Sequence, residues 1–450
     1  MRISSPLRLT ALALLPVALA ACSSESASTS TEERRAAQVD DSSHDDGHDG
    51  HDEGHEGPEG SATEEAGAQP RLAVSYDGGV QVLDAESGEV LLDEPVDGFV
   101  RLNPAGDDRH VILSRAGGFG ALDLGAWTEA HGDHGHSWTV PPALTDFSVA
   151  AEEPGHVVAH AGTTTLFDDG TGTVTAFDTD SLTELASKAP DMTTWTLDQA
   201  HHGVAVVDEH GSLIHTVGDQ DGATGIRVET NGGAELVASP VRGEGSCPGL
   251  HGEAYLGEMA AFGCQDGVLL IEGTELTKVD SPDAYGRIGN QAGHESSPVL
   301  LGDYKTDPDP RGGLERPTRV ALVDSRDAAL RLVDLGTSYT FRSLGRTENG
   351  DGVVLGTDGA LHLIDVERAR VTRRIDVLDP WREPTDWQQP RPTLEVVGDT
   401  AYVTDPERSR VHVIDLTAQG AGAVSDSIEL DVVPNELQAI SGRASDGRPA

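Results

Sequence analysis

The sequence has few cysteines, few basic residues and, beyond its first 20 residues, no long hydrophobic run. A membrane-spanning helix needs about 20 consecutive apolar residues, so we expect the rest of the chain to be soluble. There are 31 Lys and Arg against 77 Asp and Glu, which gives a net charge of −46. Such an acidic chain repels phosphates, which excludes nucleic acid as a partner. The sequence also lacks a nucleophile motif, a Cys-x-x-Cys-His haem attachment and a Gly-rich nucleotide loop, so we do not expect an enzyme.

The N-terminus has the features of an export signal. Two arginines precede an apolar run at residues 9–20, which is too short to span a bilayer. The run ends in Leu-Ala-Ala-Cys at residues 19–22, which resembles a bacterial lipobox; an ordinary secretory signal with a chance Cys is the alternative. We therefore expect residues 1–21 to be a lipoprotein signal peptide. Cys22 would carry lipid and anchor a secreted protein on the outer face of the cytoplasmic membrane, as its only contact with that membrane.

The other two cysteines, Cys247 and Cys264, form an even pair in an oxidising compartment. Under those conditions we expect a disulfide. A thiolate metal site is the alternative, but neither cysteine has a partner at two-residue spacing. The sequence therefore predicts a disulfide that holds the segment between the two cysteines rigid.

Composition divides the mature chain into three parts. Residues 22–69 are rich in Ser, Glu, Asp, Gly and His and have almost no large apolar residue, so we expect a disordered tether. Residues 70–438 alternate short apolar runs with Asp-Gly, Gly-Gly and Asn-Gly turns, which are typical of strands joined by hairpins. We expect residues 439–450 to form a disordered tail.

One signature recurs in the strand region: two apolar residues, then an acidic residue and a turn. The acidic positions are Asp84, Asp123, Asp178, Glu272, Asp324 or Asp334, Asp365 and Asp415, with a degenerate copy that ends in His215. Their mean spacing is roughly 45 to 50 residues, which is the length of a four-stranded blade. We therefore predict an all-β fold, a single β-propeller with seven or eight four-stranded blades, eight being favoured. A β-helix is the alternative, although its repeat is much shorter.

The tether contains four histidines interleaved with Asp, Glu and Gly, at His44, His48, His51 and His55. Imidazole suits zinc, copper and nickel, and a flexible backbone lets several side chains surround one ion. A solvated acidic linker is the alternative, but such linkers have little use for His. We expect the tether to capture metal with modest affinity, because the segment must become ordered when it binds.

A second group of histidines lies inside the strand region, after the strand that ends at Asp123. His131, His134 and His136 fall within six residues that also contain two glycines, as expected for a loop. Three imidazoles can chelate one ion, and zinc usually takes four ligands. We expect the remaining ligands to come from another blade, a polar surface loop being the alternative.

Further histidines lie elsewhere in the strand region: His202 precedes a predicted strand, His160 ends one, and His251 lies just inside the predicted disulfide loop. These candidates are His160, His202 and His251, with His201 and His294 as weaker ones. Each alone is more often a structural residue than a ligand. Closure of a propeller ring brings distant segments together, so we expect His134, His202 and His251 to converge on one ion at one end of the axis. The predicted disulfide would hold His251 rigid and so lower the entropy cost of binding.

The same segments carry a resemblance to a known family. They are His131-Gly132-Asp133-His134, His201-His202-Gly203, Cys247-Pro248-Gly249-Leu250-His251-Gly252-Glu253-Ala254, Phe262-Gly263-Cys264-Gln265-Asp266-Gly267, Leu301-Gly302-Asp303-Tyr304 and Tyr402-Val403-Thr404-Asp405-Pro406. In this order they resemble the AztD-type zinc metallochaperone family over nearly the whole strand region. The resemblance implies a β-propeller that holds Zn²⁺ outside the cytoplasm and passes it to the zinc-specific solute-binding protein of an ABC importer. The lipobox and the additional His136 depart from the family pattern.

The leading hypothesis is therefore a zinc chaperone that transfers its metal by ligand exchange within a docked complex. A zinc scavenger or store that never donates its metal is one alternative. A metal-dependent propeller enzyme is another, since a zinc ion with an open ligand position can activate water. The residue types do not separate zinc from copper or nickel.

Overall fold

Short antiparallel strands form nearly all the regular structure of residues 62–132, 134–185, 187–219, 222–230, 233–236, 246–418 and 423–443, which are the residues that the computed structural model describes. All of them belong to the unit Glu56–Ala450. The expected signal peptide, Cys22 and the four tether histidines lie outside the described residues. No helix within those residues is long and apolar enough to cross a membrane.

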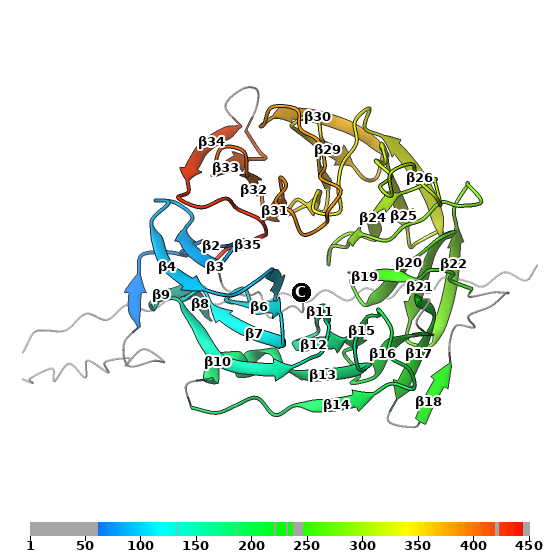
Figure 1. The fold of residues 1–450 in the computed structure, drawn as a ribbon, viewed down its shortest axis with the longest axis horizontal. Coiled ribbons are helices and arrows are strands. Elements are labelled where there is room, and N and C mark those ends of the chain that lie inside the picture. The colour runs from blue at the N-terminus through cyan, green and yellow to red at the C-terminus, as the bar shows by residue number, and fades with distance from the viewer. Residues whose placement is uncertain are drawn as a thin grey trace, which may run out of the picture. The chain divides into compact units, whose positions relative to one another are not determined.

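Eight four-stranded sheets follow one another along the described chain and form a ring (Figure 1). From inner to outer strand, blades 1 to 4 are β35 (Leu437–Ile440), β2 (Arg71–Tyr76), β3 (Gly79–Asp84), β4 (Val90–Pro95); β5 (Arg101–Pro104), β6 (His110–Arg115), β7 (Gly118–Asp123), β10 (Ala143–Ala150); β11 (Pro154–His160), β12 (Thr163–Asp168), β13 (Thr173–Asp178), β14 (Thr193–Thr196); and β15 (Ala205–Val207), β16 (Leu213–Asp219), β17 (Gly222–Thr230), β18 (Gly233–Leu236). Blades 5 to 8 are β19 (His251–Leu256), β20 (Met259–Cys264), β21 (Gly267–Glu272), β22 (Glu275–Asp280); β23 (Gln291–Ala292), β24 (Val299–Tyr304), β25 (Arg319–Asp324), β26 (Ala329–Asp334); β27 (Leu344–Arg346), β28 (Gly352–Leu355), β29 (Ala360–Asp365), β30 (Arg370–Asp376); and β31 (Leu394–Val397), β32 (Thr400–Asp405), β33 (Arg410–Asp415), β34 (Val424–Glu429). A 3₁₀ helix, η1 (Thr179–Glu184), follows β13. The predicted β-propeller is confirmed, and it has eight blades in this part of the chain.

The repeated acidic residue ends the third strand of seven of these blades. In six of the seven, the carboxylate accepts hydrogen bonds from the turn that follows, as Asp84 Oδ1 does from the backbone N–H groups of Glu86 (3.1 Å) and Ser87 (2.8 Å). Such Asx turns stabilise the reversal between strands. The member of the repeat in blade 6 is Asp324 at the end of β25, whereas Asp334 ends the outer strand β26.

The hydrophobic core lies between neighbouring blades. One cluster packs Val80 and Val82 of blade 1 against Val111, Leu113 and Leu122 of blade 2, and all five side chains are buried. Fully burying a Val or Leu side chain contributes about 1.5–3 kcal/mol. Equivalent clusters fill the other junctions between blades, so each sheet is held through both of its faces.

The last strand closes the ring. In β35, Leu437 and Ala439 pair with Val74 and Leu72 of β2, so the C-terminal segment supplies the inner strand of blade 1. The predicted tail therefore begins too early, because Ala439 and Ile440 belong to this strand and are buried. Blade 1 needs their backbone groups to pair the exposed edge of β2.

The even number of strands in each blade divides the ring into two faces. Since a four-stranded antiparallel sheet crosses the ring four times, the chain begins every blade at the same face. We call this the start face, where the inner strands begin at residues such as Arg101, Pro154 and His251. The inner strands end at the end face, near Pro104, His160 and Leu256.

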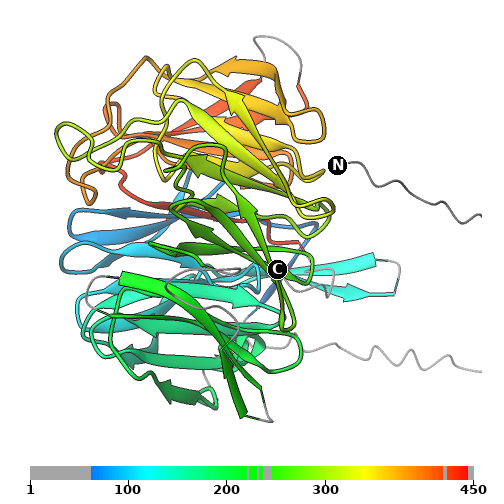
Figure 2. The same ribbon diagram turned by 90° about the vertical axis from the view of Figure 1, so that its right-hand side faces the viewer.

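A small additional sheet stands on the end face. It consists of β8 (Ala126–His131), β9 (His134–Thr139) and β1 (Thr63–Glu65), in the order β1-β9-β8. The β8–β9 hairpin is inserted between β7 and β10, whereas β1 precedes blade 1 in the chain. Figure 2 shows the β8–β9 hairpin projecting from the ring. The Thr128 hydroxyl donates to Gly442 O at 2.5 Å, just beyond the end of β35, which places the hairpin at the end face. The predicted tether, which extended to residue 69, is therefore too long, because residues 63–65 form β1. Glu65 of this strand also accepts a hydrogen bond from the Thr139 hydroxyl at 2.8 Å.

Candidate metal centre

Three histidines from three successive blades meet at the start face. They are His156 in β11, His202 just before β15 and His251 at the beginning of β19. One potential ligand atom from each ring lies within 4.8 Å of the other two. The Nε2 atoms of His202 and His251 are 3.1 Å apart, close to the separation of about 3.3 Å that tetrahedral Zn–N bonds require. The three rings therefore have the spacing of a metal site.

Two of the three rings bond an oxygen partner through Nδ1, and the third has a carboxylate nearby. Nδ1 of His202 lies 2.5 Å from Asp169 Oδ2, and Nδ1 of His251 lies 2.6 Å from the Gly289 carbonyl oxygen. Nδ1 of His156 lies 3.7 Å from Glu253 Oε2. Metal-binding histidines typically donate their second N–H to a carboxylate or carbonyl, which fixes the ring and the tautomer. These contacts leave the Nε2 atoms of His202 and His251 to face each other.

Local backbone structure holds His202 in place. The Asp169 carboxylate also accepts the backbone N–H of Gly203 at 3.3 Å, so one carboxylate fixes both the ring and the chain beside it. A Cβ atom at Gly203 would clash with the Thr216 hydroxyl and with His201, and only glycine fits there. His201 itself uses both ring nitrogens, with the Gln199 carbonyl at 2.9 Å and the Thr216 hydroxyl at 2.8 Å. His201 is therefore a structural residue.

A disulfide supports His251. Cys247 and Cys264 are bonded, as the sequence predicts, and the pair is buried in the core between blades. The backbone N–H of Leu250 donates to Ala223 O at 3.1 Å, which ties the same segment to blade 4. His251 therefore follows directly on a segment fixed at two points.

The electrostatic environment keeps two of the rings neutral. Burial, together with His202 and Arg287, lowers the pKa of His251 to about 4. Burial likewise holds the pKa of His156 well below its usual value. The hydrogen bond to Asp169 raises the pKa of His202, whose side chain is 53% exposed. Neutral imidazoles bind metal, so the cluster is ready to accept an ion after it releases at most the proton on His202.

His156 is not among the residues predicted from the sequence, which favoured His160 of the same strand. His160 lies at the opposite end of β11, where its ring stacks on Tyr255 with 3.4 Å between centroids. His160 and His294 both line a cavity of about 570 Å³ that Glu253 also lines, and neither residue belongs to the three-histidine cluster. The signal that identifies His156 is its position near the start of an inner strand, which it shares with His251.

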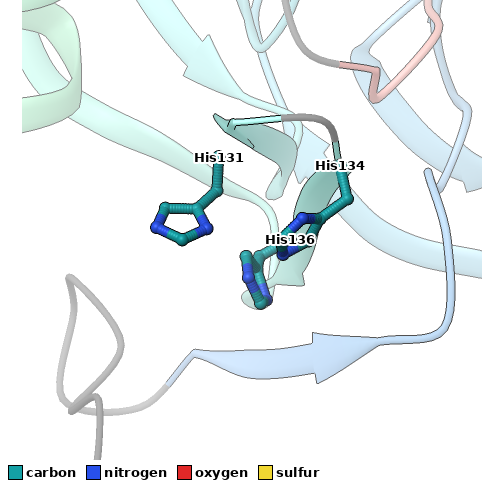
Figure 3. Close-up of side chains that lie close together, drawn as sticks. All are labelled: His131, His134 and His136. Carbon is teal, nitrogen blue, oxygen red and sulfur yellow. The ribbon is translucent and has the colours of Figure 1, made fainter. Parts of the chain in front are cut away.

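A second histidine cluster lies on the β8–β9 hairpin (Figure 3). His131, His134 and His136 each offer a ligand atom within 4.8 Å of the other two, and His131 pairs with His134 across the hairpin. Glu64 of β1 approaches this cluster, with Oε1 2.7 Å from Nδ1 of His136. His131 and His134 are exposed, so this cluster is much more open than the first.

The prediction that His134 shares one ion with His202 and His251 is wrong. The hairpin is inserted after β7, the third strand of blade 2, and a third strand ends at the end face. His202 and His251 lie at the start face. The described residues therefore contain two separate three-histidine clusters.

No protein-family model matches the sequence. The zinc chaperone AztD of Citrobacter koseri is 27% identical over 356 residues, which cover 75% of this chain and 79% of that protein. The sequence resemblance to AztD is confirmed. The crystal structure of Citrobacter koseri AztD matches this fold with a TM-score of 0.71 at 24% identity, over 83% of this chain and 98% of AztD. The structure of apo AztD from the same organism gives a TM-score of 0.68 at 23% identity over the same shares. Both AztD structures support the β-propeller fold.

Proposed function

We propose that this chain is an extracytoplasmic zinc chaperone. It holds Zn²⁺ between His156, His202 and His251 and passes the ion to the solute-binding protein of a zinc ABC importer. The observation that carries the proposal is the convergence of three imidazoles from three blades, two of which bond an oxygen through Nδ1. The likeness to the zinc chaperone AztD supports zinc as the metal.

Three histidines leave one position of a tetrahedral zinc ion open. Because the His202 side chain is 53% exposed, an acceptor can reach this position from the start face. A ligand from the acceptor then binds before any histidine leaves, so the ion stays coordinated throughout the transfer. An open position combined with firm support on the protein side suits a carrier of zinc.

The same open position is compatible with zinc-dependent hydrolysis, which needs a base beside the metal-bound water. Burial raises the pKa of Glu253 to about 7, which is suitable for a base. However, the Glu253 carboxylate faces Nδ1 of His156, and Asp169 is bonded to His202. Asp169 therefore orients a ligand and is not free to act as the base, and with the likeness to a zinc chaperone we favour a carrier over an enzyme.

The hairpin cluster is a second zinc site in this proposal. His131, His134 and His136 supply the ligands, and Glu64 orients His136. Its exposure makes it weaker than the start-face cluster, because water competes for the ion and the rings lose more freedom on binding. The lipid anchor at Cys22 remains part of the proposal, and the Cys247–Cys264 disulfide supports export, since disulfides persist in oxidising compartments.

Zinc titration against a competing chelator tests the proposal. We expect the triple variant His156→Ala, His202→Ala, His251→Ala to lose the tightest site and one equivalent of zinc. His210→Ala is the matched control, since His210 is exposed and belongs to neither cluster. If the triple variant kept the tightest site, the proposal would fail. If the wild type bound zinc but kept it when mixed with the apo solute-binding protein, the chain would be a zinc store.

A further inference from the structure

The start face carries an aromatic pair, of which one ring is exposed, in addition to the histidines. Phe99 and Trp387 pack edge to face with 5.1 Å between ring centroids, and Trp387 is 48% exposed. Val433 is equally exposed. The three residues precede the inner strands β5, β31 and β35, so they belong to blades 2, 8 and 1 at the face that holds His156, His202 and His251 in blades 3, 4 and 5. We call Phe99, Trp387 and Val433 the apolar patch.

Buried polar groups hold the loop that presents Trp387. The Arg391 guanidinium is almost fully buried; it pairs with Glu383 at 3.0 Å and donates to Asp386 O at 2.6 Å. Arg342 donates to Trp387 O at 3.4 Å, and the Asn435 amide donates to Gln388 O at 2.8 Å. The loop is thus fixed from both sides while its largest apolar side chain faces solvent. A rigid exposed tryptophan loses little freedom when a partner covers it, which favours binding.

Two arginines flank the histidine cluster at the same face. Arg101 follows Phe99 by two residues and is 43% exposed. The Arg287 guanidinium packs against Gly289, where an added Cβ would lie 3.1 Å from Arg287 Nε. The carbonyl oxygen of Gly289 is the oxygen that His251 bonds. Arg101 also pairs with Glu436, with 3.6 Å between Nε and Oε1. The two guanidinium groups attract carboxylates, which favours a partner that brings acidic ligands.

We propose that the start face is the docking surface for the zinc acceptor, a protein that presents carboxylates beside an apolar pocket. The apolar patch is the anchor, and Arg101 and Arg287 guide the carboxylates towards the open position on the ion. Tryptophan and arginine dominate the binding energy of protein interfaces, and complementary charge speeds association. The inference rests on the proposed function, because only a transfer of zinc requires the acceptor to cover this cluster.

The test measures the rate of zinc transfer from the full chain to the apo solute-binding protein of the zinc ABC importer of the same genome, with the acceptor below saturation. We expect Trp387→Ala to slow transfer by about tenfold or more, while its zinc affinity stays within about twofold of the wild type. Trp387→Phe should restore most of the rate. Met192→Ala is the matched control, because Met192 is an exposed apolar residue on the connection between β13 and β14, which emerges at the end face.

A second arm tests the charges. We expect added salt to slow transfer by the wild type, and to slow Arg101→Gln less. Equal rates for Trp387→Ala and the wild type would overturn the inference, as would an equal loss in Met192→Ala. If the wild type transferred no zinc at all, the proposed function itself would fail, which is a distinguishable result.

Discussion

The Nε2 atoms of His202 and His251 lie 3.1 Å apart, although the residues are separated by 49 positions in the sequence. Each belongs to a different blade, and His156 joins them from a third. No single blade can form this site, so it depends on the ring that packs the blades together. Any change that alters the packing of blades 3, 4 and 5 should therefore also change the metal affinity.

Substitutions of His156 and His160 should show which of the two histidines of β11 binds zinc, the one that the structure indicates or the one that the sequence predicted. We predict that His156→Ala weakens the tightest zinc site by more than about 100-fold, since loss even of a partner that orients a ligand costs 10–100-fold. His160→Ala should leave that affinity nearly unchanged, because His160 stacks on Tyr255 at the other end of the strand. Chelator competition measures both. The reverse order of effects would place the ion near His160.

Asp169 should set the pH dependence of zinc binding. Its hydrogen bond raises the pKa of His202, and a protonated ring cannot bind metal. Zinc affinity of the wild type should therefore fall as the pH falls through the raised pKa of His202. Asp169→Asn removes the charge and lowers that pKa, so the fall should begin at a lower pH.

The Asp169→Asn variant should also bind zinc about 10–100-fold more weakly at high pH, because an amide makes the His202 ring less basic than a carboxylate does. Titrations between about pH 5 and 8 cover the range in which histidine changes charge. A pH profile identical in the variant and the wild type would contradict the role of Asp169.

Reduction of the disulfide should weaken both the fold and the start-face site. The bond closes a loop with a sequence separation of 17, for which loss of the crosslink costs about 3 kcal/mol of unfolding free energy. Cys247→Ser, Cys264→Ser should therefore unfold at lower urea concentration and bind zinc more weakly at the start face. The hairpin cluster at the end face serves as the internal control and should keep its affinity. An unchanged start-face affinity would show that the disulfide does not position His251.

The hairpin should hold its own zinc ion. We predict that a full chain in which His44, His48, His51 and His55 are changed to Ser still binds two equivalents of zinc. Adding His134→Ala should reduce this to one, and Glu64→Gln should weaken the second equivalent without removing it, because Glu64 contacts His136. Calorimetric stoichiometry distinguishes these cases. A single equivalent before His134 is changed would refute the second site.

The sequence was sufficient for the repeat, the propeller, the disulfide and two of the three start-face histidines. The repeat was readable because an acidic residue ends the third strand in seven blades, and in six of them its carboxylate caps the following turn. The sequence could not distinguish His156 from His160, because residues four apart in a strand point to the same side of the sheet and differ only in which end of the strand they occupy. It also could not separate His134 from His202, because the face at which a loop emerges depends on how many strands precede it in the blade. The pairing of β1 with β9 was hidden for a similar reason, as the segment around Glu64 has no strand pattern of its own.

Anomalous diffraction at the zinc absorption edge, from a crystal of the zinc-loaded protein, tests the central claim most directly. The account predicts a strong peak between His156, His202 and His251, within bonding distance of the Nε2 atoms of His202 and His251. A second, weaker peak should lie on the β8–β9 hairpin. Zinc found only at the hairpin or the tether, with none among the three start-face histidines, would contradict the account.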